Sequence, residues 1–263
     1  RDSIRRQRQM CIRDRMWEEL KTHLLEELDY LQEAENISRI STLHRDLPEV
    51  LVPGVIEELS TQRVLTMDYV PGIKPADACS EQYSQELKDR WGSVLMNFVV
   101  RGLIEHRFLH ADPNFGNYAF LEDGRLIVYD HGCIKRVPEP VASGYRKVLR
   151  SLIDHDLDGL PARLQELGIY YRKSGRPVPR RLLDPLAREA MKIVGPVAFQ
   201  FSRDTGIYNV ILDESGSYLK ESSDMALPPD LIFVNRTLSG LFGNLCSLGS
   251  TGQWAAVLEP YTR

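Results

Sequence analysis

Cysteine is scarce in this chain, and its spacing suits neither disulfides nor metal binding. The four cysteines among 263 residues lie far apart, and no two of them form a C-x-x-C pair: Cys11, Cys79, Cys133 and Cys246. Such spacing supports neither a disulfide framework nor a zinc site. A reducing compartment, the cytoplasm, is therefore expected.

Basic charge and long apolar runs are also lacking. The net charge is −4, whereas nucleic-acid-binding domains are usually basic, so no nucleic-acid partner is expected. A membrane-spanning helix needs about 20 consecutive apolar residues. The nearest stretch, 231–248, is interrupted by Asn235, Arg236 and Asn244. We interpret it as a buried helix, and peripheral association with an inner membrane stays open.

The first fifteen residues differ from the rest of the chain. They are rich in arginine and have almost no apolar periodicity. Because they lack an apolar core segment they are not a signal peptide, and we expect residues 1–15 to be a basic arm or a non-native or disordered segment. A helical pattern then starts at Met16 as if in mid-domain, which predicts that the natural protein continues upstream.

The whole chain of 263 residues is 43% hydrophobic and 27% charged, a balance typical of a folded globular protein. Apolar residues three and four positions apart predict a helix from Met16 to about Leu43, and a long helix is expected at about 81–106. Further helices are expected at about 140–156, 157–168, 181–200 and 229–248. β-prone runs predict strands at 55–59, 63–70, 118–121 and 126–129, with weak strand character at 208–212.

A polar segment after the long helix carries the residues that point to function. Residues 110–117 read HADPNFGN, and 130–132 read DHG. The first has the H-x-D-x-x-x-x-N spacing of a kinase catalytic loop, and the second follows the Asp-Gly turn of a short hairpin, as a kinase magnesium element does. Asp112 is predicted to face the acceptor hydroxyl, while Asn117 and Asp130 supply oxygen ligands to Mg²⁺.

Each of these residues has a plainer alternative. Asp112 would be a turn aspartate before Pro113, Asn117 a strand cap, and 130–132 a strand-ending turn. The order, the spacing and the strand-turn-strand context occur together, and this favours function. His110 either orients the loop through a hydrogen bond or is a satisfied core histidine, and the sequence does not choose between these.

The first helix is strongly acidic. Five acids and no Lys or Arg lie between Lys21 and Arg39. Asp29 and Glu33 are four residues apart, where like charges are mildly destabilising, so a cation from elsewhere would relieve them. In kinases the corresponding helix supplies a glutamate to the lysine that binds the α- and β-phosphates. Glu33 is predicted to be that glutamate, and a solvated acidic face is the alternative.

The run 63–70, followed by Pro71 and Gly72, predicts a strand that enters a hinge between two lobes. Backbone groups of Met67, Asp68, Tyr69 and Val70 are the candidates for binding adenine. A core strand ending in a turn is the alternative.

Three segments resemble a known family: 27–36 (ELDYLQEAEN), 64–72 (VLTMDYVPG) and 108–113 (FLHADP). They are similar to the AarF/UbiB family of atypical kinase-like proteins, associated with ubiquinone biosynthesis. The resemblance is clear over 16–138 and fainter beyond. It implies an α+β, protein-kinase-like fold with a partial N-lobe over 16–70 and a mostly helical C-lobe over 71–263.

The resemblance also implies an activity. It implies ATP binding with Mg²⁺, ATPase or small-molecule kinase activity, and support of lipid-quinone synthesis near a membrane or in a biosynthetic complex. By motif, Glu27 and Asp29 match the family's E-x-D pair and Glu33 its lysine-pairing glutamate. Two other functions are weighed against a kinase or ATPase: a nucleotide-sensing adaptor, and a phosphotransferase of the aminoglycoside or choline kinase type.

Three departures from the family pattern stand out. The chain has Asn114-Phe115 where the family has His-Pro, and His131 where it has the phenylalanine of Asp-Phe-Gly. The family's Ala-rich nucleotide loop, its nearby lysine and its Lys-x-Gly-Gln segment are absent from this sequence. We therefore expect the chain alone to bind ATP weakly or to be inactive. His131 is expected to be a partly exposed spacer, and packing that is sensitive to pH is the alternative.

Overall fold

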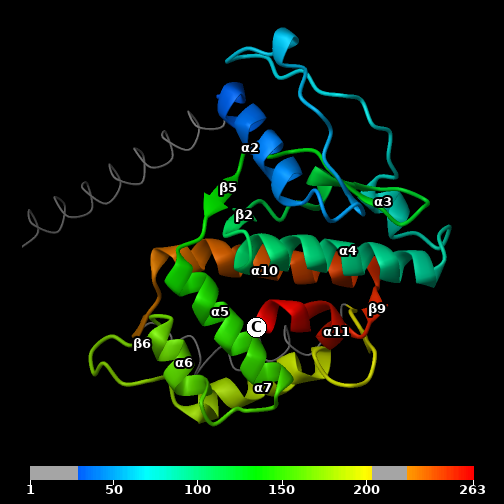
Figure 1. Cartoon of the computed structure of the whole chain (residues 1–263). Coiled ribbons are helices and arrows are strands. Elements are labelled where there is room, and N and C mark those ends of the chain that lie inside the picture. Colours follow the sequence, from blue (N-terminus) through cyan, green and yellow to red (C-terminus); the bar gives the residue numbers. More distant parts are fainter. Residues whose placement is uncertain (1–28, 203–223) are drawn as a thin grey trace, which may run out of the picture.

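Helices dominate the computed structural model, which describes residues 29–202 and 224–263 (Figure 1). The helices are α2 (Tyr30–Leu43), α3 (Pro75–Ala78), α4 (Gln85–Ile104), α5 (Glu139–Ile153), α6 (Leu160–Glu166), α7 (Arg180–Ile193), α10 (Pro229–Leu248) and α11 (Trp254–Leu258), with 3₁₀ turns η1 (Glu57–Leu59), η2 (Phe115–Asn117) and η3 (Glu259–Thr262). The strands are β1 (Val50–Leu51), β2 (Phe108–His110), β3 (Tyr118–Phe120), β4 (Leu126–Val128), β5 (Ile134–Arg136), β6 (Tyr170–Tyr171), β7 (Phe199–Gln200), β8 (Met225–Ala226) and β9 (Thr251–Gly252).

Helices α4 and α10 run side by side across the middle of the molecule, with α2 and β2–β5 on one side and α5, α6, α7 and α11 on the other (Figure 1). Helix α4 begins where Ser84 accepts a hydrogen bond from the N–H of Leu87, 3.3 Å away, as an N-cap does. Most of its residues from Trp91 onward are buried, including the fully enclosed Trp91 and Leu95. The strands β2 and β4 pack against this central helix.

Four short strands form two nested hairpins. Strand β2 pairs antiparallel with β5, and β3 pairs antiparallel with β4. The inner hairpin turns at Asp123 and Gly124, where Gly124 has a φ of 89° that suits glycine. The nesting brings residues 111–117 and 129–133, the two loops between the pairs, to the same edge.

Most predicted helices after residue 80 are confirmed, within a few residues at their ends. The predicted helix 229–248 coincides with α10, which ends at Gly249 with a φ of 66°. The helix predicted at 181–200 ends early, at Ile193, before Gly195 and Pro196. The predicted strand at 208–212 lies outside the described residues.

The predicted strands 55–59 and 63–70 are wrong. Residues 57–59 form η1, and the strand pairing between the two runs is limited to isolated antiparallel bridges, Val55 with Met67 and Thr61 with Val64. A β-prone run becomes a strand only when a neighbouring strand pairs with it, and in the described part of the chain these runs find no continuous partner. Tyr69 is 89% exposed.

The continuous helix predicted from Met16 is also wrong at Asp29. Asp29 has non-helical backbone angles, and its carboxylate accepts hydrogen bonds from the N–H groups of Leu31 and Gln32, at 3.2 and 3.4 Å. It is therefore the N-cap of α2, a role in which aspartate is favoured. Residues 16–28, with Glu27 among them, lie outside the described residues. The division into lobes at residue 70 stays a prediction.

Candidate active site

The two predicted loops of the site face each other. On one side the N–H of Ala111 donates to the carbonyl of Cys133 at 2.8 Å, and on the other the N–H of Tyr129 donates to the carbonyl of Asn117 at 2.9 Å. Asp112 follows the first bond and Asp130 the second. Both residues therefore lie on the two loops that the strand pairs bring together, and their roles stay a prediction.

Asp112 and Asn117 are joined directly. The Nδ2 of Asn117 donates to Oδ2 of Asp112 at 2.7 Å, and the N–H of Asn114 donates to Oδ1 of Asp112 at 3.3 Å. A tight turn brings them together, because Asn114 Oδ1 accepts from the N–H of Gly116 at 3.0 Å. With its nitrogen bonded to Asp112, Asn117 has its amide oxygen as the atom that could bind a metal ion.

His110 ties the second loop to the first. It is almost fully buried, and its Nε2–H donates to the backbone carbonyl of Asp130. Burial lowers the pKa of His110, although that hydrogen bond and the charges of Asp130 and Asp112 raise it, and the neutral ring is the form that fits. Of the two interpretations left open, the geometry favours loop orientation. The side chain of Asp130 accepts from the N–H of Gly132 at 2.9 Å.

Helix α2 packs against the loop 129–133, which contains Asp130 and His131. Glu33 accepts a hydrogen bond from the N–H of His131 at 3.2 Å, and Asn36 donates to the carbonyl of the same residue at 3.0 Å. Burial, and to a smaller extent the charge of Asp130, raises the pKa of Glu33 above its ordinary value, against the effect of the hydrogen bond from His131. A nearby cation would relieve this carboxylate, which is what the prediction of a lysine partner requires.

Asn36 is a site residue that the argument from charge on α2 overlooked. Its signal was present in the sequence, since it is the last residue of the 27–36 segment that resembles the family. One turn earlier on the same helix, Glu33 accepts the hydrogen bond from the backbone N–H of His131. Together the two side chains clamp the peptide of the loop to α2.

The expectation of a partly exposed His131 is wrong. The side chain is fully buried, and neither ring nitrogen has a hydrogen-bond partner among the described residues. Its ring packs edge-on against His110, with centroids 5.7 Å apart. Burial, and then the neighbouring His110 and His44, lower the pKa of His131 to about 3.

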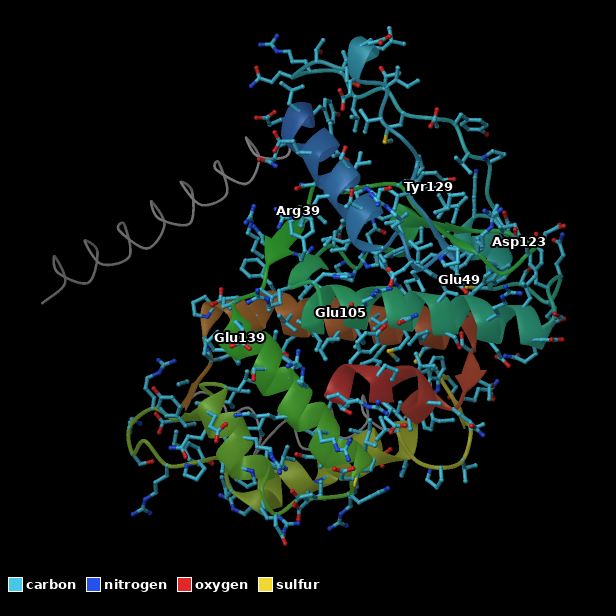
Figure 2. All side chains as sticks on the ribbon, in the orientation of Figure 1. Arg39, Glu49, Glu105, Asp123, Tyr129 and Glu139 are labelled. Atoms are coloured by element: carbon cyan, nitrogen blue, oxygen red, sulfur yellow. The ribbon has the colours of Figure 1, made fainter. Side chains whose placement is uncertain are left out.

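The predicted hinge touches the site from the side of β4. The hydroxyl of Tyr129 donates to the carbonyl of Val70 at 2.7 Å. Figure 2 shows Tyr129 on the same side of α4 as α2, whose Arg39 lies 4.7 Å over the ring of Phe108. Adenine binding by residues 67–70 stays a prediction.

Helix α10 is the part of the site that the sequence did not reveal. Its Arg236 Nη2 lies 3.6 Å from Oδ1 of Asp112, and its Asn244 Nδ2 donates to the carbonyl of Pro113 at 3.1 Å. Between them, a Cβ on Gly240 would lie 2.0 Å from Cβ of Pro113. The sequence shows that Arg236, Gly240 and Asn244 are four residues apart and so share one face of the helix. It does not show that this face packs against the loop 110–117.

The donor set fits Mg²⁺ better than a metal that needs a full protein cage. Within residues 29–202 and 224–263, no three His, Cys, Asp or Glu side chains form a cluster that could hold a metal ion. Mg²⁺ is usually held by one or two carboxylates together with substrate phosphates and water. The Asn117 amide oxygen and the Asp130 carboxylate are oxygen donors of the kind that could hold such an ion.

Comparison with known proteins identifies the family. The family model described as the ABC1 atypical kinase-like domain matches residues 5–163. The chain belongs to this atypical kinase-like family, the AarF/UbiB family. The α+β, kinase-like fold expected from the sequence is thereby confirmed.

Relatives agree with this assignment, and a solved structure agrees with the fold. The chain is 32% identical over 139 residues to the atypical kinase COQ8B, mitochondrial, of Danio rerio, covering 52% of this chain and 22% of that protein. It is 29% identical over 251 residues to the uncharacterized aarF domain-containing protein kinase At1g71810, chloroplastic, of Arabidopsis thaliana, covering 91% of this chain and 33% of that protein. The solved complex of Rv3197 with erythromycin, from Mycobacterium tuberculosis, superposes with a TM-score of 0.74 at 22% identity, over 94% of this chain and 62% of that one.

Two further facts bear on the whole protein. The chain spans 20% to 33% of the length of the first curated relatives it matches. None of the helices in the described ranges is both long and apolar enough to cross a membrane.

Proposed function

We propose that the protein is an ATP- and Mg²⁺-dependent atypical kinase or ATPase whose site is built from Asp112, Asn117 and Asp130. The observation that carries the proposal is the pair of facing loops. Nested strands bring one carboxylate that could face an acceptor beside an amide and a carboxylate that could hold magnesium. Family membership supports the same chemistry and disfavours the aminoglycoside or choline kinase alternative.

In this proposal the chain's own residues orient the reactants and move one proton. Asp112 accepts the proton of an acceptor hydroxyl or water while that oxygen bonds to the γ-phosphorus, and ADP leaves with the electron pair of the broken P–O bond. Asn117 and Asp130 would hold Mg²⁺, which when bound neutralises the phosphate charge. Glu33 would position a lysine supplied by a part of the domain outside this sequence.

The setting is also a proposal. The family resemblance implies support of ubiquinone or other isoprenoid-lipid biosynthesis, with peripheral contact to a membrane or a biosynthetic complex. The side chain of Asp112 is partly exposed, which suits a small-molecule or water acceptor as well as a larger one. A nucleotide-sensing adaptor is the remaining alternative.

The test is the variant Asp112→Asn in the full-length protein. Asparagine can still accept the hydrogen bond from Asn117 but cannot accept a proton, so phosphate release should fall by about a hundredfold. Binding of Mg·ATP, measured as a thermal shift, should be kept. Unchanged turnover in the variant contradicts the role of Asp112. A thermal shift with no turnover in the wild type would support the adaptor.

A further inference from the structure

One face of α10 contacts the predicted catalytic loop at three successive turns. Arg236, Gly240 and Asn244 are four residues apart, so they lie on one stripe of the helix. Gly240 lets Pro113 approach so closely that any side chain would collide with it, and Asn244 holds the carbonyl of Pro113. The register of α10 against the loop is therefore fixed.

That register directs one cation at Asp112. Arg236 stands at the end of the stripe, with its Nη2 3.6 Å from Oδ1 of Asp112. The side chain of Arg236 is 59% exposed, whereas that of Asp112 is 27% exposed. The guanidinium is thus the more solvent-exposed partner of this pair, and a ligand at Asp112 could reach it from solvent.

The loop itself brings no positive charge to this place. Residues 110–117 contain neither Lys nor Arg. The nearby Lys135 is turned to the ring of Phe233, with its Nζ 5.3 Å from the centroid. A phosphoryl group approaching Asp112 would bring negative charge toward a carboxylate, and this requires a compensating cation besides the metal.

We propose that Arg236 is the phosphoryl-binding cation of this site. It pairs with Asp112 when no nucleotide is bound, and it contacts the γ-phosphoryl group when Mg·ATP is bound. The proposal rests on the proposed function and deepens it, because it assigns a contact to the transferred group. Arginine suits the task, since its planar guanidinium can engage phosphate oxygens with two parallel hydrogen bonds.

The test compares Arg236→Gln and Arg236→Lys with the wild type and with Arg188→Gln, all in the full-length protein. Arg188 is an exposed arginine of α7, on the far side of α4 and α10 from the loops. Exposed ion pairs add little to stability, so all three variants should unfold within about 2 °C of the wild type. Loss of turnover through unfolding is thereby separated from loss of a contact.

The first measurement is binding by calorimetry, which does not require turnover. Arg236→Gln should weaken binding of Mg·AMP-PNP, a non-hydrolysable analogue that has the γ-phosphoryl group, by about tenfold relative to Mg·ADP. Arg236→Lys should recover part of this preference, and Arg188→Gln should not change it. Equal weakening of both nucleotides by Arg236→Gln, or no weakening, overturns the proposal.

The second measurement is turnover. With Arg236→Gln, kcat for phosphate release should fall at least tenfold, with partial recovery in Arg236→Lys. If the wild type turns over Mg·ATP and Arg236→Gln equals it, the proposal for Arg236 fails while the proposed function stands. A wild type without turnover contradicts the proposed function, and calorimetry then decides the proposal for Arg236.

Discussion

Replacement of Asp130 by asparagine should abolish Mg²⁺-dependent nucleotide turnover in the full-length protein. The change keeps the shape of the side chain, and the asparagine oxygen can still accept the hydrogen bond that Gly132 gives to Asp130 at 2.9 Å. It removes the negative charge that a divalent ion needs. We expect phosphate release to fall on the order of a thousandfold, as when an electrostatic group is removed from an active site.

Asp123→Asn is the matched control for this prediction. Asp123 is an exposed carboxylate in the turn of the same hairpin, paired with Arg125 at 2.8 Å. Loss of the negative charge of Asp123 should leave nucleotide turnover unchanged. Both variants should keep the unfolding temperature of the wild type within a few degrees, and turnover should be measured over a range of Mg²⁺ concentrations. If Asp130→Asn turns over ATP at the normal rate, the proposed metal site is wrong.

The second large effect should be a loss of stability in mild acid. Burial lowers the pKa of His44 to about 4 and that of His131 to about 3. The unfolded chain takes up these protons below about pH 6.5, while the folded chain does not. The unfolded state therefore binds more protons, and stability falls as pH drops from about 6.5 toward 4.

The charges around these two rings act in the same direction. His44 is close to His106 and Arg101, and His131 is close to His110, and each of these lowers the pKa of the ring it faces. Each histidine should contribute up to about 1.4 kcal/mol of lost stability per pH unit in this window. Chemical unfolding at pH 7 and pH 5 measures the loss.

His131→Phe should reduce this loss. Phenylalanine carries no proton and leaves no unpaired nitrogen in the buried site, so the free energy of unfolding at pH 7 should rise by roughly 1–3 kcal/mol. The dependence of the free energy of unfolding on pH should become less steep, by the contribution of one histidine. His155→Asn is the control, because His155 is exposed and asparagine tolerates its φ of 55°. An unchanged slope in His131→Phe would show that this ring is not the acid-sensitive group.

Local sequence was sufficient to predict the inner part of the site. The turn at Asp123 and Gly124, the two short strands beside it and the spacing of the loop residues all depend on contacts between near neighbours in the chain. The pairing of β2 with β5 around this hairpin was not predicted. Glu33 was reached from the pattern of charge on one helix, and the structure places it against His131.

What the sequence could not predict depends on distant partners. The run 63–70 has strand-forming residues but no continuous neighbour to pair with, so propensity alone misled. The burial of His131 follows from the packing of α2 and β2 around it, which its own neighbours do not reveal. Arg236 lies far along the chain from Asp112, and its role follows only from the crossing of α10 beneath the loop.

The nested hairpins also have a consequence for biogenesis. All the pairing that brings the two loops together lies within the contiguous segment 108–136, and closing such short loops carries a small entropic cost. Domains fold largely from the N-terminus onward during synthesis, so the carboxylates can meet while α10 is still inside the ribosome. Arg236 on α10 is synthesised after both loops, so the nascent chain has the two loop carboxylates in place before this cation can reach Asp112.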